Sequence, residues 1–160
     1  MFFVLVILPA EKEELRMARI YKEIIINAPP QKIFNYLIKP GNLPKIWPGV
    51  IEIKNEQLSP SGYYIVEWVY KAAGRDLKGT GEYVDMAQNK YFKIKTKGGL
   101  NSTISCTVQS RNNDTRVTLT MDYRVPSALL GKLTRRVTLK IDEQETHQIL
   151  ANLRVILEKS

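Results

Sequence analysis

Aromatic side chains recur at even spacing in the segment 63–72. Tyr64, Trp68 and Tyr70 share one face of an extended strand with Val66. Each Tyr or Trp combines a large apolar body with one hydrogen-bonding tip, whereas a simple core more often uses Leu, Ile and Val. This concentration of aromatic residues favours the wall of a cavity that holds a hydrophobic small molecule. Ordinary core packing is the alternative interpretation of each single residue.

Further aromatic and apolar residues are candidates for the same ligand-binding surface. Phe92, Met121 and Tyr123 lie on the apolar faces of two later strand-like segments. Trp47 closes a short helical segment and has two possible roles. It packs that segment against a sheet or, if the cavity opens between that segment and the last helix, it controls entry of the ligand.

Two acidic residues fall in phase with apolar positions. Glu82 alternates with Val84 and Met86, and Asp142 lies on the helical stripe that includes Ile149. A carboxylate inside an apolar cavity has a raised pKa and can act as an acid or a base. The simpler roles are a solvated strand bend for Glu82 and a helix cap for Asp142, and we favour them. We therefore predict no catalytic residue and retain Glu82 only as a candidate ligand contact.

Cysteine and histidine are scarce in this chain of 160 residues, which contains one of each, Cys106 and His147. A single cysteine forms no intrachain disulfide and no cysteine-rich zinc site, and one histidine leaves little for multi-histidine or Ser-His-Asp centres. We find no glycine-rich nucleotide loop and no metal motif in the sequence. We therefore predict no metal and no cofactor. The single cysteine fits a reducing compartment, so we expect a cytoplasmic location.

Positive charge dominates the composition, with a formal net charge of +8. Lysines alternate along one strand-like segment, and a second basic cluster precedes the C-terminal stripe. The members are Lys93, Lys95, Lys97, Lys132, Arg135, Arg136 and Lys140. Such runs are usually solvated faces that keep a protein soluble. Interpreted functionally, they predict weak contact with an anionic membrane surface or with the ribosome.

Seven segments with one apolar and one polar face predict an antiparallel meander. They cover residues 19–27, 50–58, 63–72, 79–86, 90–97, 100–110 and 115–125. Between the first two, residues 30–38 predict a short helix that Pro30 opens, and residues 42–47 predict a second short helix or turn. The length of the chain suits one domain.

The C-terminal segment supplies a helix to cover the apolar face of such a sheet. Its apolar stripe comprises Ile149, Leu150, Leu153, Ile156 and Leu157. An upstream stripe at 129–141 falls on a different side of an ideal helix, and its end also suits a short strand. Asp142 and Glu145 resemble a capping box that opens a new helix. These features together predict a kink or break near residues 140–145.

The N-terminal residues 2–8 form an apolar run. The run is too short to span a bilayer as a helix, which needs about 20 residues, and it lacks the basic region and cleavage site of a secretory signal. We expect the domain to cover residues 17–160. Residues 1–16 are then a loosely docked extension or an upstream start, with a weak membrane or partner anchor as the functional alternative.

Several phrases, in this order, resemble the START-like or SRPBCC superfamily, which includes polyketide cyclase/dehydrase-like and coenzyme Q-binding proteins. The phrase at 24–34, IIINAPPQKIF, resembles the first strand entering the first helix, and NLPKIWPGV at 42–50 resembles the second helix entering the next strand. Residues 115–118 and 123–126 resemble the last strand. LLGKL at 129–133 and NLR at 152–154 resemble the two ends of the last helix.

This resemblance implies an α+β helix-grip fold of the Bet v 1/START-like type. In such a fold, a seven-stranded antiparallel sheet wraps around a long C-terminal helix, two short helices follow the first strand, and a cavity lies between sheet and helix. The resemblance also favours an unbroken last helix, against the break predicted above.

The resemblance, together with the aromatic strand face, implies binding or transport of a lipid, quinone or polyketide-like molecule without catalysis. One alternative is a polyketide aromatase/cyclase, for which an acid or base would have to come from the tyrosines, Glu82 or Asp142. The other alternative is a ribosome- or RNA-associated protein that uses its basic surface.

Overall fold

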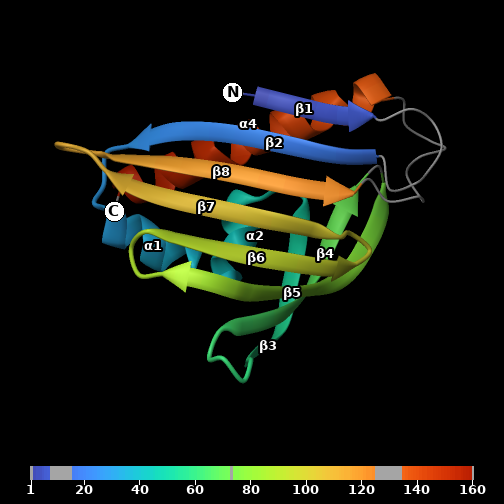
Figure 1. Ribbon diagram of the computed structural model, residues 1–160, viewed down its shortest axis with the longest axis horizontal. Coiled ribbons are helices and arrows are strands. Elements are labelled where there is room, and N and C mark those ends of the chain that lie inside the picture. The colour runs from blue at the N-terminus through green and yellow to red at the C-terminus, as the bar shows by residue number, and fades with distance from the viewer. Residues whose placement is uncertain (1, 8–15, 73, 125–134, 160) are drawn as a thin grey trace.

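An eight-stranded antiparallel sheet dominates the described part of the chain, as Figure 1 shows. The computed structural model describes residues 2–7, 16–72, 74–124 and 135–159. The strands are β1 (Phe2–Ile7), β2 (Arg16–Ile26), β3 (Val50–Leu58), β4 (Tyr64–Ala72), β5 (Arg75–Ala87), β6 (Tyr91–Gly98), β7 (Ser102–Ser110) and β8 (Thr115–Arg124). The helical elements are α1 (Pro30–Leu37), the 3-10 turn η2 (Pro40–Asn42), α2 (Leu43–Ile46) and α4 (Arg135–Lys159).

The order of strands in the sheet is β1-β2-β8-β7-β6-β5-β4-β3. Strands β2 to β8 are the seven predicted ones. β3 to β8 form a meander, and β2 pairs with β8 and not with β3, so β3 is an edge strand. This antiparallel sheet with the packed C-terminal helix confirms the predicted helix-grip architecture. β1 adds an eighth strand along β2, with Phe2 opposite Tyr21 and Ile7 opposite Arg16. The predicted division of the chain into an extension of residues 1–16 and a domain of 17–160 stays a prediction.

The two predicted short helices are present between β2 and β3. α1 begins with a proline in its first turn, where the missing N–H has no helical partner to lose. Its buried face consists of Ile33, Phe34 and Leu37. η2 and α2 follow directly, and the chain leaves α2 through Trp47, which is buried. Both helices therefore turn apolar side chains toward the interior.

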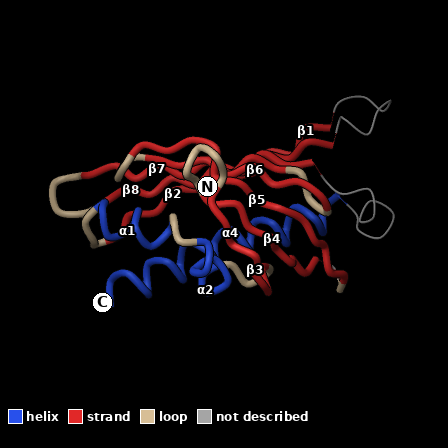
Figure 2. Tube along the Cα trace, turned by 90° about the horizontal axis from the view of Figure 1, so that it is seen from below, coloured by secondary structure: helices blue, strands red, loops and turns tan. Residues whose placement is uncertain are grey.

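Helix α4 lies against the same face of the sheet as α1 and α2, and Figure 2 shows the helices together beneath the strands. Four of the five residues in its predicted stripe are buried, since Ile149, Leu150, Leu153 and Leu157 are each at most 5% exposed, and the fifth, Ile156, is partly buried. Polar contacts fix its position along the sheet. The Arg154 guanidinium donates to the carbonyl oxygen of Ile25 at 2.9 Å, and Asn152 donates to that of Ile46 at 3.0 Å.

The predicted break near residues 140–145 is wrong, because α4 is one helix from Arg135 to Lys159. The capping-box interpretation misled the prediction. The carboxylate of Glu145 does not return to a helix terminus but accepts hydrogen bonds from Trp47 and Tyr70, which belong to other elements. A side chain that could cap a helix thus makes long-range contacts in the middle of one.

Alternation decides which side chains of the strands enter the interior. In β8, buried and partly exposed residues alternate from Thr115 to Tyr123, as the sequence pattern predicts. β5 differs, because its register against β6 shifts between Tyr83 and Asp85. This bulge leaves Val84 without a direct partner and reverses the phase of alternation along the strand. Gly81 and Tyr83 point inward before it, and Met86 packs against the core after it.

Candidate functional site

A cavity lies between the sheet and the segment α2–Trp47, and we call it the sheet cavity. Its walls come from α2, from strands β3 to β7 and from the turn between β6 and β7. The lining residues are Leu43, Trp47, Val50, Ile53, Val66, Trp68, Tyr70, Gly81, Tyr83, Ile94, Thr96, Leu100, Ser102 and Ile104. Most of these side chains are aliphatic or aromatic, which is typical of sites for hydrophobic small molecules.

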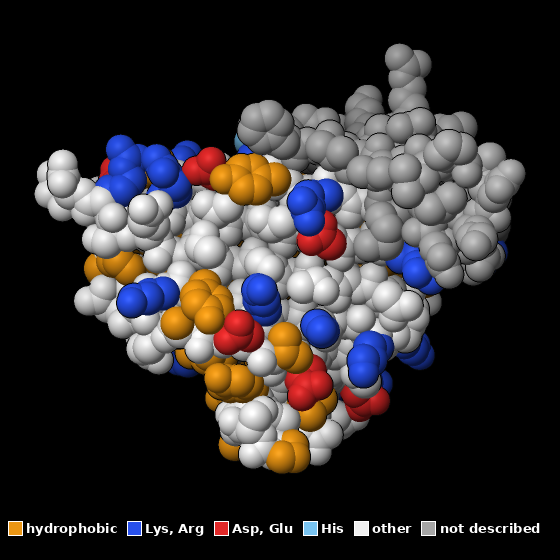
Figure 3. Space-filling view, in the orientation of Figure 1, with side chains coloured by type: hydrophobic (Ala, Val, Ile, Leu, Met, Phe, Trp, Pro, Cys, Tyr) orange, Lys and Arg blue, Asp and Glu red, His pale blue; other side chains and the backbone are white. Residues whose placement is uncertain are grey.

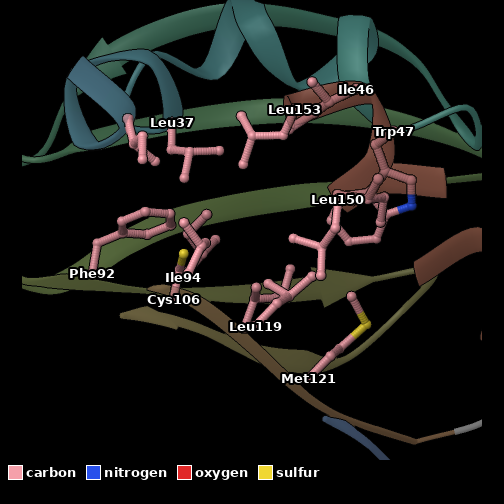
Figure 4. Packing of buried hydrophobic residues seen from close by; sticks show 14 of the residues in the cluster. Leu37, Ile46, Trp47, Phe92, Ile94, Cys106, Leu119, Met121, Leu150 and Leu153 are labelled. Carbon is pink, nitrogen blue, oxygen red and sulfur yellow. The ribbon is translucent and has the colours of Figure 1, made fainter. Parts of the chain in front are cut away.

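A second cavity, the helix cavity, lies between the sheet and helices α1, α2 and α4. It is lined by Leu37, Leu43, Ile46, Trp47, Phe92, Ile94, Ile104, Cys106, Val117, Leu119, Ile149, Leu150 and Leu153. Figure 4 shows Leu150 and Leu153 facing Phe92, Ile94 and Cys106 across this space. The two cavities share Leu43, Trp47, Ile94 and Ile104, so these four side chains form the partition between them.

Both cavities are small in this structure. The sheet cavity leaves about 60 Å³ in which the centre of a water molecule can move, within about 590 Å³ of atom-free space that includes its opening to solvent. The corresponding volumes of the helix cavity are about 40 Å³ and about 440 Å³. Ligand pockets usually measure roughly 300–1,000 Å³. Occupation by an ordinary ligand therefore requires the walls or the partition to move.

A carboxylate stands at the rim of the sheet cavity. Glu145 of α4 accepts a hydrogen bond from the indole Nε1 of Trp47 at 2.6 Å and another from the hydroxyl of Tyr70 at 2.5 Å. The two aromatic rings meet edge to face, with centroids 6.3 Å apart. Gly49 makes this arrangement possible, because an added Cβ would lie 2.3 Å from the Tyr70 ring. The network joins α2, β4 and α4 at one point.

Hydrogen bonds also occupy the polar groups deeper in the sheet cavity. Tyr83 is 1% exposed, and its hydroxyl donates to the carbonyl oxygen of Leu37 at 3.1 Å; burial raises the pKa of this phenol. Thr96 donates to the carbonyl oxygen of Leu100 at 2.8 Å and lies 2.6 Å from the hydroxyl of Ser102. In contrast, the indole Nε1 of Trp68 is buried and has no hydrogen-bond partner in the described part of the protein.

The structure places four of the eight predicted ligand-contacting residues on these cavities. Trp68 and Tyr70 line the sheet cavity, Phe92 lines the helix cavity and Trp47 lines both. The remaining three aromatic or apolar candidates belong to the core and line neither cavity. They are Tyr64, which packs against Tyr83, and the buried Met121 and Tyr123. Ligand contact itself stays a prediction for all of them.

Glu82 is a candidate ligand contact for which a solvated position is the favoured interpretation, and its contact with a ligand stays a prediction. Glu82 lines neither cavity. In the register of β4 against β5, it lies opposite Ile65, whereas the cavity-lining Val66 lies opposite Gly81. Strict alternation along the strand would place Glu82 on the same face as Met86. The bulge at Val84 interrupts that phase, which places Glu82 on the opposite face of the sheet. Asp142 lies within α4, and its side chain is outside the described residues.

Sequence reasoning missed several residues of the site. Tyr83 was not among the predicted site residues, although its aromatic side chain is a signal for burial. Glu145 was interpreted only as part of a capping box. Thr96 and Ser102 carry no pattern that separates them from ordinary strand residues. Their contribution comes from the pairing of β6 with β7, where they lie directly opposite each other.

The outer face of the sheet carries the predicted lysine stripe. Lys93, Lys95 and Lys97 are exposed, as expected. On the neighbouring strand, Asp85 lies opposite Lys93 and Glu82 lies opposite Lys95. Figure 3 shows Lys and Arg side chains interspersed with Asp and Glu on this face. Lys132 lies outside the described residues, as do the side chains of Arg135 and Arg136, so contact of these residues with a membrane or ribosome stays a prediction.

The described residues contain no group of three or more His, Cys, Asp and Glu side chains placed to hold a metal ion. None of the helices in the described part of the chain combines the length and hydrophobicity that crossing a membrane requires.

Comparison with known families and structures agrees with this geometry. The model of the family "Polyketide cyclase / dehydrase and lipid transport" matches residues 17–158. Similar solved structures include a protein from Thermus thermophilus (19% identity, TM-score 0.74, 89% of this chain and 99% of that chain). A START superfamily protein from Mycobacterium smegmatis is also similar (11%, 0.73, 88% and 97%), as is the Zhui aromatase/cyclase from a Streptomyces species (16%, 0.67, 89% and 93%). No curated protein sequence matches the chain.

Proposed function

The chain belongs to the polyketide cyclase/dehydrase and lipid transport family, and from this premise we propose that it binds a hydrophobic small molecule without transforming it. The ligand is a lipid, quinone or polyketide-like compound. One observation carries the proposal. Two adjoining cavities lie between the sheet and the helices, and almost all of their lining is apolar or aromatic. Removal of apolar surface from water is the driving force for binding in such a space.

The partition between the cavities determines how large the ligand can be. Leu43, Trp47, Ile94 and Ile104 line both spaces. We expect changes in their rotamers to join the two cavities when a ligand enters, because each cavity alone is smaller than ordinary ligand pockets. The Glu145 contacts hold Trp47 at this partition, so the rim network sets the resting size of the opening.

Native mass spectrometry of the freshly purified protein, measured beside its denatured mass, tests the proposal. We expect a reproducible additional mass that extracts into organic solvent. A matched variant, Gly81→Leu, places side-chain atoms inside the sheet cavity. An added Cβ at Gly81 has its nearest neighbour 3.5 Å away, so the new side chain has room to begin. This variant should lose the additional mass. A clean apo mass, with no uptake of added lipid, quinone or polyketide, would contradict the proposal.

A polyketide aromatase/cyclase is the second candidate, and one observation favours it. Tyr70 lines the sheet cavity and its hydroxyl donates to the carboxylate of Glu145, so a hydrogen-bonded phenol and carboxylate lie next to the ligand space. Such a pair can move a proton to or from a bound substrate. Incubation with a linear poly-β-ketone tests it. If the protein is an enzyme, Tyr70→Phe abolishes cyclisation and Tyr64→Phe, which changes a tyrosine outside the cavity lining, preserves it.

A further inference from the structure

Polar side chains lining the sheet cavity differ in whether their protons are already used. Within the described residues, the lining includes six side chains that can donate a hydrogen bond: Trp47, Trp68, Tyr70, Tyr83, Thr96 and Ser102. Buried donors in native proteins almost always have a partner. An account of each proton therefore shows what the cavity offers to a ligand.

The three aromatic groups other than Trp68 have donated their protons to the protein. Trp47 and Tyr70 both donate to the Glu145 carboxylate, and the Tyr83 hydroxyl donates to the carbonyl oxygen of Leu37. A carboxylate or a carbonyl oxygen only accepts, so the direction of each of these bonds is fixed. None of these three protons is free for a ligand while the contacts last.

The two hydroxyl groups form a chain with a fixed direction. Thr96 must donate to the carbonyl oxygen of Leu100, because that oxygen has no proton to give. The single proton of the Thr96 hydroxyl is then used. Ser102 must therefore be the donor in its 2.6 Å contact with Thr96. The hydroxyl protons of Thr96 and Ser102 are therefore both used in hydrogen bonds, and Ser102 can only accept a further one.

Trp68 is the exception. It is 7% exposed, and its Nε1 has no partner in the described part of the protein. An indole N–H only donates, so neither rotation nor a change of tautomer relieves it. A buried donor without a partner costs roughly 1–3 kcal/mol. A phenylalanine would fill much of the same space without this cost.

The surrounding backbone accommodates this indole closely. An added Cβ at Gly79 would lie 2.5 Å from Cζ2 of Trp68, and one at Gly81 would lie 3.5 Å from its Cδ1. The edge of the ring that carries Nε1 therefore lies along these two glycines of β5. This fit holds the indole, which lines the cavity, in one orientation along β5, close to where Thr96 lies opposite Gly81.

We propose that the unpartnered indole N–H of Trp68 is the donor that fixes an oxygen of the ligand at the inner wall of the sheet cavity. The inference rests on the proposed function and narrows its ligand class. The ligand is a hydrophobic compound with a carbonyl-type acceptor oxygen, such as a ketone, quinone or ester. A pure hydrocarbon leaves the donor unpaired. The aliphatic part of the ligand extends toward the helix cavity.

Two small probes of the same shape test the inference, acetophenone and α-methylstyrene, which differ by an oxygen in place of a methylene group. The chain contains two tryptophans, so ¹⁵N-labelled protein gives two indole resonances. Trp47 is already bonded to Glu145 and serves as the internal reference. We expect acetophenone to move the Trp68 indole proton downfield saturably, and α-methylstyrene to leave it near its starting position.

Variants supply the second readout. Trp68→Phe should lower the ratio of ketone affinity to alkene affinity by roughly fivefold, the effect of one typical hydrogen bond. Tyr123→Phe is the matched control, since the Tyr123 hydroxyl is also buried and unpartnered in the described region but lines neither cavity. It should leave the ratio unchanged.

The outcomes separate the inference from the proposed function. Binding of both probes with the same ratio in Trp68→Phe, or equal movement of the Trp68 resonance by both, would overturn the inference alone. A trapped water that stays on the indole proton in the ketone complex would do the same. Binding of neither probe would overturn the proposed function and this inference together.

Discussion

The two cavities share a partition but differ in the chemistry of their walls. The sheet cavity has six side chains that can donate hydrogen bonds among its described lining residues, whereas the described lining of the helix cavity has only Trp47 and Cys106. The nitrogen of Trp47 is bonded to Glu145. The Cys106 thiol is fully buried, and burial raises its pKa to about 12, so it stays neutral at ordinary pH. The walls of both cavities are apolar, but only the sheet cavity has an unpartnered nitrogen or oxygen donor among its described lining residues, the indole of Trp68.

This difference indicates how a ligand is oriented. An oxygen atom in the helix cavity would lose its hydration without gaining a donor, which costs free energy. The same oxygen in the sheet cavity has the Trp68 indole N–H nearby. We therefore expect the oxygenated part of the ligand in the sheet cavity and its hydrocarbon part against α4.

Truncation of a side chain that lines the helix cavity should give the largest loss of stability. Leu153 is 1% exposed and lines this cavity alone. Leu153→Ala should lower the free energy of unfolding by about 3 kcal/mol, because it removes buried methyl groups and leaves a void. Urea denaturation measures the loss. The larger void should also raise the affinity for α-methylstyrene.

Leu58→Ala is the matched control for this truncation. Leu58 is 63% exposed, so its replacement should change stability by less than about 0.5 kcal/mol. If the two leucine variants lost the same free energy of unfolding, the helix cavity would not be part of a packed core.

Packing of β5 against the Trp68 indole predicts a somewhat smaller loss of stability. A Cβ at Gly79 would lie 2.0 Å from the carbonyl oxygen of Lys97 and 2.5 Å from Cζ2 of Trp68. Gly79→Ala should therefore cost about 2 kcal/mol, because the backbone and the indole must shift. Thermal and urea unfolding measure it. In Gly81→Ala the new Cβ meets only ordinary van der Waals contacts, so we expect a smaller loss of stability. A loss as large as that of Gly79→Ala would contradict the packing described.

Weakening the hydrogen bonds of Glu145 with Trp47 and Tyr70 should give the next largest loss of stability. Glu145→Gln keeps one acceptor oxygen for Trp47 and Tyr70 but removes the charge that strengthens both bonds. We expect a loss of about 1 kcal/mol in stability. The indole proton of Trp47 should move upfield in the ¹H–¹⁵N spectrum, while that of Trp68 stays in place. If only the Trp68 proton moved, the carboxylate of Glu145 would contact Trp68 and not Trp47, which would contradict the structure.

Cys106 should produce the smallest effect, through pH. Its pKa is 9.0 in an exposed chain and about 12 in the fold, so the fold favours the neutral thiol. This contribution is fully present below pH 9 and is lost as the pH rises from 9 to 12. At pH 9 the loss is about 0.4 kcal/mol, since half of the unfolded thiols are ionised. Urea midpoints of the wild type and Cys106→Ala at pH 7 and 9 measure it. If the wild type instead became more stable relative to the variant as the pH rises, the raised pKa of Cys106 would be contradicted.

Local patterns predicted the fold well because alternation and helical spacing are local properties. The apolar residues of β8 and the stripe from Ile149 to Leu157 appear where the sequence indicates. The bulge at Val84 was not predictable, since one extra residue in a strand is visible only when its partner strand is known. A pattern without this bulge places Glu82 inside and Tyr83 outside, the reverse of the structure.

Contacts between distant parts of the chain limited prediction of the site. Glu145 lies 98 positions from Trp47, and no local pattern connects them. The aromatic face of β4 did predict two lining residues, Trp68 and Tyr70. It could not indicate that the proton of Tyr70 is used and that of Trp68 is free for a ligand.

The most direct test of the central claim is a methyl NMR titration of the protein with acetophenone. The Ile94 and Ile104 methyl groups line both cavities, whereas Ile51 and Leu58 are exposed and serve as references. Binding between the sheet and the helices predicts saturable shifts of Ile94 and Ile104 with Ile51 and Leu58 unchanged. Shifts confined to the exposed methyl groups, or no saturable shift at Ile94 and Ile104, would contradict it.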